Sequence, residues 1–231
     1  PMAASDAFAG VVLVARDGAA VYERPFGLAD RSKKSAITPA TRFNLGSINK
    51  IFTKTAIAQL IAQGKLALTD TIGKLLPDYP NAQARPATID QLRNHRAGVS
   101  DFFVPEFDRE PKSRFRSNAD YFQFLAPRPL LFEPGTQTEY CNGCYVVLGA
   151  IIERGSGSRY EDYTAGHVFS PARITGAGFF QADRFQTGVA RHAPPPARRP
   201  AAHAHPARTE TAAGDAHRGR PRRAPRPELV R

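Results

Sequence analysis

The sequence predicts a mixed α/β (α+β) fold, an antiparallel sheet flanked by helices, over residues 1–186 of the 231-residue chain. Two observations predict it: a pair of short apolar runs with β-branched residues, separated by a turn dipeptide, and several later segments with apolar residues at helical spacing. Residues 187–231 differ in composition, and we expect them to form a separate Arg/Pro/Ala-rich tail.

The predicted sheet begins with a hairpin. The segment "GVVLVARDGAAVYERPFG" has two apolar runs around Asp17-Gly18, a dipeptide that suits the positive φ angles of a tight turn. We therefore expect strands over residues 10–15 and 19–26. Because an isolated hairpin is only marginally stable in water, these strands need further sheet partners.

The first predicted helices follow the hairpin. Apolar residues recur at helical spacing from Ser47 to Gln63, and Gly64 suits the left-handed position just after a helix. The segment "LTDTIGKLLPDYP" then predicts a short helix with Thr69 or Asp70 as its cap.

The remaining helices complete the predicted domain. Thr88 and Gln91 have the spacing of a capping box at the start of the next helix. Further helical segments are expected around residues 118–125, over 142–155 with Gly155 at the end, and over 160–170 before Pro171.

The basic charge of the chain is concentrated in the tail. The formal net charge is +11, and residues 191–231 hold ten Arg against three acidic residues, or +7 of that total. This segment has eight Pro and no Phe, Ile or Tyr, so it lacks the apolar side chains that offset the entropy of ordering. We expect it to be disordered. Binding of nucleic acid or another anionic polymer through these arginines is an alternative function.

No stretch approaches the roughly 20 apolar residues of a membrane-spanning helix, and "PMAASDAFAGVV" lacks the pattern of a signal peptide. We therefore expect the chain as given to be soluble. Because it begins with Pro1, its compartment stays open: periplasmic or secreted if a signal peptide has been removed, and cytoplasmic otherwise.

Ser47-Ile48-Asn49-Lys50 is the first candidate for chemistry. Positions i and i+3 share one helix face, so the Lys50 ammonium can lie beside the Ser47 hydroxyl. A helix N-terminus offers N–H groups and a positive dipole end to a developing oxyanion, which suits an acyl-accepting serine. The alternative is that Ser47 is an N-cap and Lys50 a solvated residue, since S-x-x-K is common by chance.

The surroundings of this motif resemble the serine β-lactamase-like family, which includes class C β-lactamases, DD-peptidases and related esterases. "TRFNLGSINKIFTKTAIAQLIAQGKLALTDTIGKLLPDYP" followed by "ATIDQLRNHRAGV" has the family's order of motifs. The resemblance implies a β-lactamase/transpeptidase-like fold with a helical subdomain. The matching residues are Arg42, Phe43, Gly46, Ser47, Lys50, Gly64, Lys65, Leu66, Asp70, Leu76, Pro77, Gln91, Leu92, His95 and Gly98.

The resemblance also implies a tyrosine-x-asparagine motif, and Tyr140-Cys141-Asn142 follows Ser47 by 93 residues. By this resemblance, Tyr140 and Lys50 relay the proton of Ser47, and Asn142 holds Lys50 and the substrate. The alternative is that Tyr140 is a packed aromatic and Asn142 a helix cap.

The implied activity is that of a serine hydrolase that forms an acyl-enzyme on an amide or ester: a β-lactam, a peptide or a carboxylic ester. Ser47, Lys50 and Tyr140 are the expected catalytic residues, and Asn142 the expected substrate-binding residue. The expected partner is a small-molecule or peptide substrate. No cofactor, metal or membrane span is expected, and nucleic acid is not the expected partner of the folded part.

Cys141 and Cys144 raise the question of a redox or metal site. A C-x-x-C at a helix start suits thioredoxin-like chemistry, but no βαβ pattern precedes it. A structural zinc site needs four ligands, and the folded part adds only His95 and His167, which we expect to be structural. The resemblance places Cys141 at a position that is commonly serine and Cys144 on a buried helix face.

A third family motif, lysine-threonine-glycine or histidine-x-glycine on a strand, has no convincing match. Lys54-Thr55-Ala56 lies inside a predicted helix, and His217-Arg218-Gly219 is followed by prolines that exclude a central strand. The resemblance ends near residue 186, so we expect the C-terminal sheet strands to be missing and hypothesise a shift of reading frame there. An inactive truncated fragment is therefore a further alternative.

Overall fold

The computed structural model describes residues 8–180 and residue 190. Contacts divide the chain into two units, residues 1–192 and 193–231, and the second lies outside the described residues. Most of the expected tail, with its formal His217-Arg218-Gly219 match, therefore falls outside them too. Its disorder stays a prediction.

The predicted hairpin is present. Strand β1 (Gly10–Arg16) pairs antiparallel with β2 (Ala19–Phe26). Asp17 and Gly18 between them have φ angles of 51° and 79°, which confirms the predicted turn. A second antiparallel pair joins β3 (Leu28–Asp30) to β4 (Ser35–Ala36). Helices and small antiparallel sheets together confirm the mixed α/β class.

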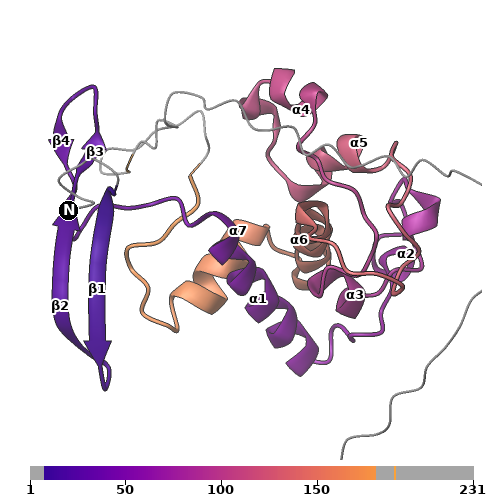
Figure 1. The fold of residues 1–231 in the computed structure, drawn as a ribbon. Helices are drawn as coiled ribbons and strands as arrows, with labels where there is room; N and C mark the ends of the chain where they lie inside the picture. Colours follow the sequence, from indigo (N-terminus) through magenta and orange to yellow (C-terminus); the bar gives the residue numbers. More distant parts are fainter. Residues whose placement is uncertain (1–7, 181–189, 191–231) are drawn as a thin grey trace, which may run out of the picture. The chain divides into compact units, whose positions relative to one another are not determined.

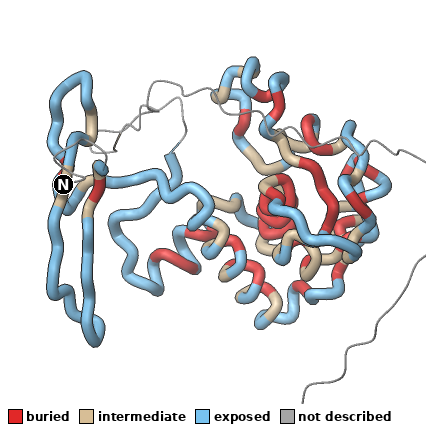
Figure 2. Tube along the Cα trace, viewed as in Figure 1, coloured by how far each residue is buried: buried red, intermediate tan, exposed pale blue. Residues whose placement is uncertain are grey.

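The hairpin leaves its apolar side chains uncovered. Leu13 and Val21 are 59% and 58% exposed, and β1 and β2 are drawn almost entirely as exposed in Figure 2. Each sheet has two strands within the described part of the chain, so the further partners that the hairpin needs are not among these residues.

The long helix predicted from Ser47 consists of two parts. A 3₁₀ turn, η1 (Gly46–Asn49), leads directly into α1 (Lys50–Ala62). Gly64 has a φ of 70°, as expected for the glycine that follows the helix. Thr53, Ala56, Ile57 and Leu60 form the buried face of α1.

The next helices test the predicted caps. In α2 (Ile72–Leu75) the cap is Thr71, whose hydroxyl accepts from the Lys74 N–H, so the prediction of Thr69 or Asp70 was wrong. Asp70 instead accepts from the Ala67 N–H at 2.8 Å and from the Lys74 ammonium at 2.5 Å. The Thr88–Gln91 capping box is confirmed at the start of α3 (Ile89–Arg93).

Shorter elements complete the helical part. The predicted helix around residues 118–125 is present as η4 and α5, and the one from residue 160 as α7, continued by a π turn. The shorter elements of the helical part are η2 (Ala82–Ala84), α4 (Pro105–Arg109), η3 (Lys112–Arg114), η4 (Asn118–Tyr121), α5 (Phe122–Leu125), α7 (Tyr160–Thr164) and the π turn η5 (Ala165–Phe169).

Helix α6 (Asn142–Ser156) is the centre of the helical part. It contacts α1, α2, α3 and α7 (Figure 1), and nine of its fifteen residues are buried. Its C-cap is Gly157, with a φ of 72°, and not Gly155 as the sequence suggested. None of the described helices combines the length and apolarity that crossing a bilayer requires.

The start of α6 is pressed against the chain at residues 99–101. A Cβ on Gly143 would lie 2.2 Å from the Ser100 carbonyl oxygen and 2.8 Å from a methyl of Leu125. Only glycine therefore permits this approach, which brings residue 101 next to the first turn of α6.

Candidate active site

The four predicted site residues come from two segments that meet in the fold. Ser47 lies in η1, and Lys50 is the first residue of α1. Tyr140 lies in the extended segment before α6, and Asn142 is the first residue of that helix. Packing of α1 against α6 brings the two segments together.

Lys50 connects the other three side chains. Its Nζ donates to Ser47 Oγ at 3.3 Å and to Asn142 Oδ1 at 2.8 Å. Ser47 Oγ and Tyr140 Oη share a hydrogen bond. The structure thus gathers Ser47, Lys50, Tyr140 and Asn142 in one hydrogen-bonded cluster. Their catalytic and binding roles stay predictions.

The geometry differs from the alternatives in which Ser47 and Asn142 are helix caps and Tyr140 is a packed aromatic residue. Leu45, not Ser47, is the N-cap of η1, and Cys141, not Asn142, is the N-cap of α6. Tyr140 is 54% exposed, so it is not a buried packing residue. The Ser47 hydroxyl also belongs to an exposed residue, and the cluster can therefore be reached from solvent.

The cation of Lys50 sets the electrostatics of the cluster. Its Nζ lies 4.8 Å from the ring centroid of Tyr140 and 5.1 Å from that of Tyr145. Hydrogen bonding to Lys50, and then to Ser47, lowers the pKa of Tyr140 below its ordinary value, because both favour the phenolate. A lowered pKa raises the fraction of the phenolate near neutral pH, and the phenolate is the form that can accept a proton.

His95 supports the segment that carries Tyr140. Its Nδ1 accepts from the Cys141 N–H at 3.2 Å, and its carbonyl oxygen accepts from the Glu139 N–H at 3.0 Å. The ring lies 4.8 Å from that of Tyr140. Burial, and then the charge of Lys50, lower the pKa of His95, so the neutral ring that these contacts need is favoured.

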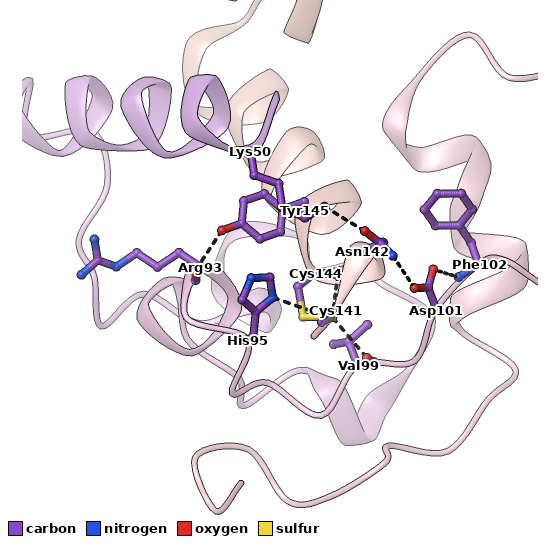
Figure 3. Close-up of a disulfide and its surroundings, with 10 residues drawn as sticks. All are labelled: Lys50, Arg93, His95, Val99, Asp101, Phe102, Cys141, Asn142, Cys144 and Tyr145. Carbon is purple, nitrogen blue, oxygen red and sulfur yellow. Dashed lines mark hydrogen bonds between the residues drawn. A yellow bond between two sulfur atoms is a disulfide. The ribbon is translucent and has the colours of Figure 1, made fainter. Parts of the chain in front are cut away.

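Cys141 and Cys144 form a disulfide that was not predicted from the sequence (Figure 3). Cys141 Sγ accepts from the Cys144 N–H at 2.9 Å, so it caps α6, and it lies 3.2 Å from the Val99 carbonyl oxygen. Cys144 is buried, as expected. The C-x-x-C spacing was the available signal, since residues three apart at a helix start lie close together.

Asp101 also belongs to the cluster, although no sequence pattern predicts it. Its Oδ2 accepts from Asn142 Nδ2 at 2.7 Å, as Figure 3 shows. The residue lies in an irregular segment with no periodicity, and only the tertiary fold brings it to Asn142. No group of three or more His, Cys, Asp or Glu side chains with metal-binding geometry occurs among the described residues.

Comparisons with known proteins show similarity to proteins named as penicillin-binding proteins. PbpX of Bacillus subtilis, named as a penicillin-binding protein, is 33% identical over 174 residues, which are 75% of this chain and 42% of that protein. A crystal structure of a penicillin-binding protein from Bacillus halodurans superposes with a TM-score of 0.68 and 29% identity. It covers 73% of this chain and 52% of that one.

A further solved structure is that of EstCE1, described as a hydrolase with promiscuous acyltransferase activity. It is 30% identical, with a TM-score of 0.66, and covers 78% of this chain and 50% of that one. The chain thus spans about half the length of these structures and less than half of PbpX. The beta-lactamase family model matches residues 1–220. The chain belongs to the beta-lactamase family.

Proposed function

We propose that the chain acts as a serine hydrolase in which Ser47 is acylated by an amide or an ester. The observation that carries the proposal is the hydrogen-bonded cluster of Ser47 with Lys50 and Tyr140. Membership of the beta-lactamase family, and neighbours named as a penicillin-binding protein and a hydrolase, support the same class of reaction.

The first step of the proposed reaction is attack of Ser47 Oγ on the carbonyl carbon. The hydroxyl proton passes to the Tyr140 oxygen, which the adjacent Lys50 cation favours as a phenolate. The tetrahedral intermediate then collapses as the amine or alcohol leaves with that proton. An acyl-enzyme on Ser47 remains, and attack by water releases the acid and restores the hydroxyl.

The rate of this reaction depends on how well the oxyanion is held. We propose the backbone N–H of Ser47 itself as one donor, because the N–H groups of Gly46, Ile48 and Lys50 already donate to other acceptors. No lysine-threonine-glycine or histidine-x-glycine sequence occurs within residues 8–180 to supply a second donor from a strand. Losing one such donor costs roughly 10²–10³ in kcat. We therefore propose slow turnover and choose activated reagents for the test.

The test is covalent labelling of the purified chain with a fluorescent fluorophosphonate and a fluorescent penicillin. We expect at least one of them to label the protein, with the label located at Ser47 by peptide mass spectrometry. Ser47→Ala should abolish labelling. The penicillin separates β-lactam recognition from general acylation, because the fluorophosphonate reports only an activated serine.

Ser113→Ala is the matched control, since Ser113 is an exposed serine in η3, far along the chain from the cluster. It should label like the unaltered chain. Circular dichroism and urea unfolding of each protein establish that it is folded. A folded chain that neither reagent labels would show that the proposal is wrong and that the chain is inactive towards both reagents.

A further inference from the structure

The Asn142 side chain lies between two groups of opposite charge. Its Oδ1 accepts from the Lys50 ammonium at 2.8 Å, and its Nδ2 donates to the Asp101 carboxylate at 2.7 Å. A primary amide has a donor end and an acceptor end, whereas an ammonium only donates and a carboxylate only accepts. Rotating the amide by 180° would therefore place two donors together on one side and two acceptors on the other.

Asp101 is itself held in place by the backbone. Its Oδ1 accepts from the Phe102 N–H at 2.7 Å and from the Phe103 N–H at 3.4 Å, which leaves Oδ2 directed at Asn142. The close approach of Gly143 to Ser100 fixes the neighbouring backbone against the first turn of α6. Figure 3 shows Asp101 between Asn142 and Phe102.

We propose that Asp101 is a positioning residue of the candidate active site, which binds the amide end of Asn142 so that its oxygen faces Lys50. The inference rests on the proposed function, because the purpose of the arrangement is to hold the Lys50 ammonium beside Ser47. With the amide reversed, Lys50 loses an acceptor and meets a second donor. The hydrogen bond from Lys50 to Ser47 is already long, at 3.3 Å, and without the Asn142 acceptor the ammonium is no longer held beside the serine.

The test exchanges the two side chains. Asp101→Asn leaves either Asn142 or the Phe102 N–H without its acceptor, and Asn142→Asp places two carboxylates in contact. In the double variant Asp101→Asn/Asn142→Asp, residue 101 donates to the new carboxylate, and that carboxylate accepts from Lys50. The contacts of residue 101 with the Phe102 N–H and of residue 142 with Lys50 are then kept, and the contact between residues 101 and 142 is restored with donor and acceptor exchanged.

We expect Asp101→Asn to slow fluorophosphonate labelling about tenfold, the loss of roughly one charge-assisted hydrogen bond. Asn142→Asp should slow it further, and the double variant should label faster than either single variant. In these variants the reagent concentration that gives half of the maximal labelling rate should change less than the maximal rate itself. Asp108→Asn, which alters an exposed carboxylate on α4, is the matched control and should label like the unaltered chain.

A second measurement decides the inference without activity. The side-chain NH₂ signals of Asn142 in a ¹⁵N-edited NMR spectrum, assigned by their loss in Asn142→Asp, should move in Asp101→Asn and stay in place in Asp108→Asn. If the unaltered chain does not label, the proposed function fails, and these signals alone decide the role of Asp101. Unmoved Asn142 signals overturn the inference. So does normal labelling of Asp101→Asn, or a double variant that labels no faster than the faster of the two single variants.

Discussion

The hydroxyl groups of Ser47 and Tyr140 share a hydrogen bond across 93 residues of sequence. Lys50 contributes to this pair from one turn beyond Ser47, where it donates to the serine oxygen and lies over the tyrosine ring. The cluster therefore depends on the packing of α1 against α6 and not on either motif alone.

Removal of the Tyr140 hydroxyl tests its part in proton transfer. Tyr140→Phe keeps the ring beside His95 but removes the oxygen that is bonded to Ser47. We expect the labelling rate with fluorophosphonate to fall by about 10²–10⁴, the usual contribution of a general base. Tyr22→Phe, on the exposed hairpin strand β2, should leave the rate unchanged. Equal rates for all three proteins would exclude the role.

The pH dependence of labelling should report the titration of Tyr140. Because hydrogen bonding to Lys50 is the largest cause that lowers the pKa of Tyr140, the labelling rate should rise with pH around a midpoint below 10.0. Lys50→Met removes that cause, so the midpoint should move to higher pH and the rate should fall. Lys54→Met, one turn further along α1, is the control. A midpoint unmoved in Lys50→Met contradicts the assignment.

Local chemistry explains which parts of the fold could be predicted from sequence. The Asp17-Gly18 turn, the Thr88–Gln91 capping box and the contact of Lys50 with Ser47 each involve residues at most three positions apart. Such features depend on backbone geometry that neighbouring residues determine. The Tyr140-x-Asn142 motif was predicted only through the family resemblance, because no local rule joins it to Ser47.

The features that the sequence did not predict depend on long-range packing, or on which of several neighbouring residues takes the same position at a helix end. Three consecutive residues, Thr69 to Thr71, can all cap a helix, and the fold uses Thr71 because Asp70 binds Lys74 instead. Gly155 lies inside the last turn of α6 and Gly157 follows the helix, and it is Gly157 that takes the left-handed conformation. Asp101 lies in an irregular segment, and its contact with Asn142 joins residues 41 positions apart.

The close approach of Gly143 to the Ser100 carbonyl oxygen predicts that a larger residue at position 143 lowers stability. In Gly143→Ala the added methyl would meet the Ser100 carbonyl oxygen, so either α6 or the 99–101 segment must move. We expect the free energy of unfolding in urea to fall by about 1–3 kcal/mol, as for other overpacked sites. Gly166→Ala is the control, because a Cβ there meets nothing within 4 Å. Similar stabilities for the two variants would contradict the predicted clash.

The cysteines should contribute to stability partly through the helix cap. Cys141→Ser/Cys144→Ala removes the disulfide but keeps an oxygen able to accept from the N–H of residue 144 and to donate to the Val99 carbonyl. Cys141→Ala/Cys144→Ala removes both features. We expect the serine variant to be more stable in urea by about 1 kcal/mol, the usual value of an N-cap. Equal stabilities would mean that the capping contact contributes nothing measurable.

His95 should make stability depend on pH. Its pKa in the folded chain is lowered from 6.5, chiefly by burial, so the unfolded chain binds a proton more readily. Stability from this group is therefore fully present above about pH 6.5 and is lost as pH falls towards the lower folded pKa. Protonation of Nδ1 would also place a second donor against the Cys141 N–H.

The variant His95→Asn tests this dependence. In it the group no longer titrates, and asparagine tolerates the positive φ of 61° at this position. We expect urea midpoints at pH 7.5 and 5.5 to differ more for the unaltered chain than for His95→Asn. The same loss in both proteins would assign the acid sensitivity to other groups.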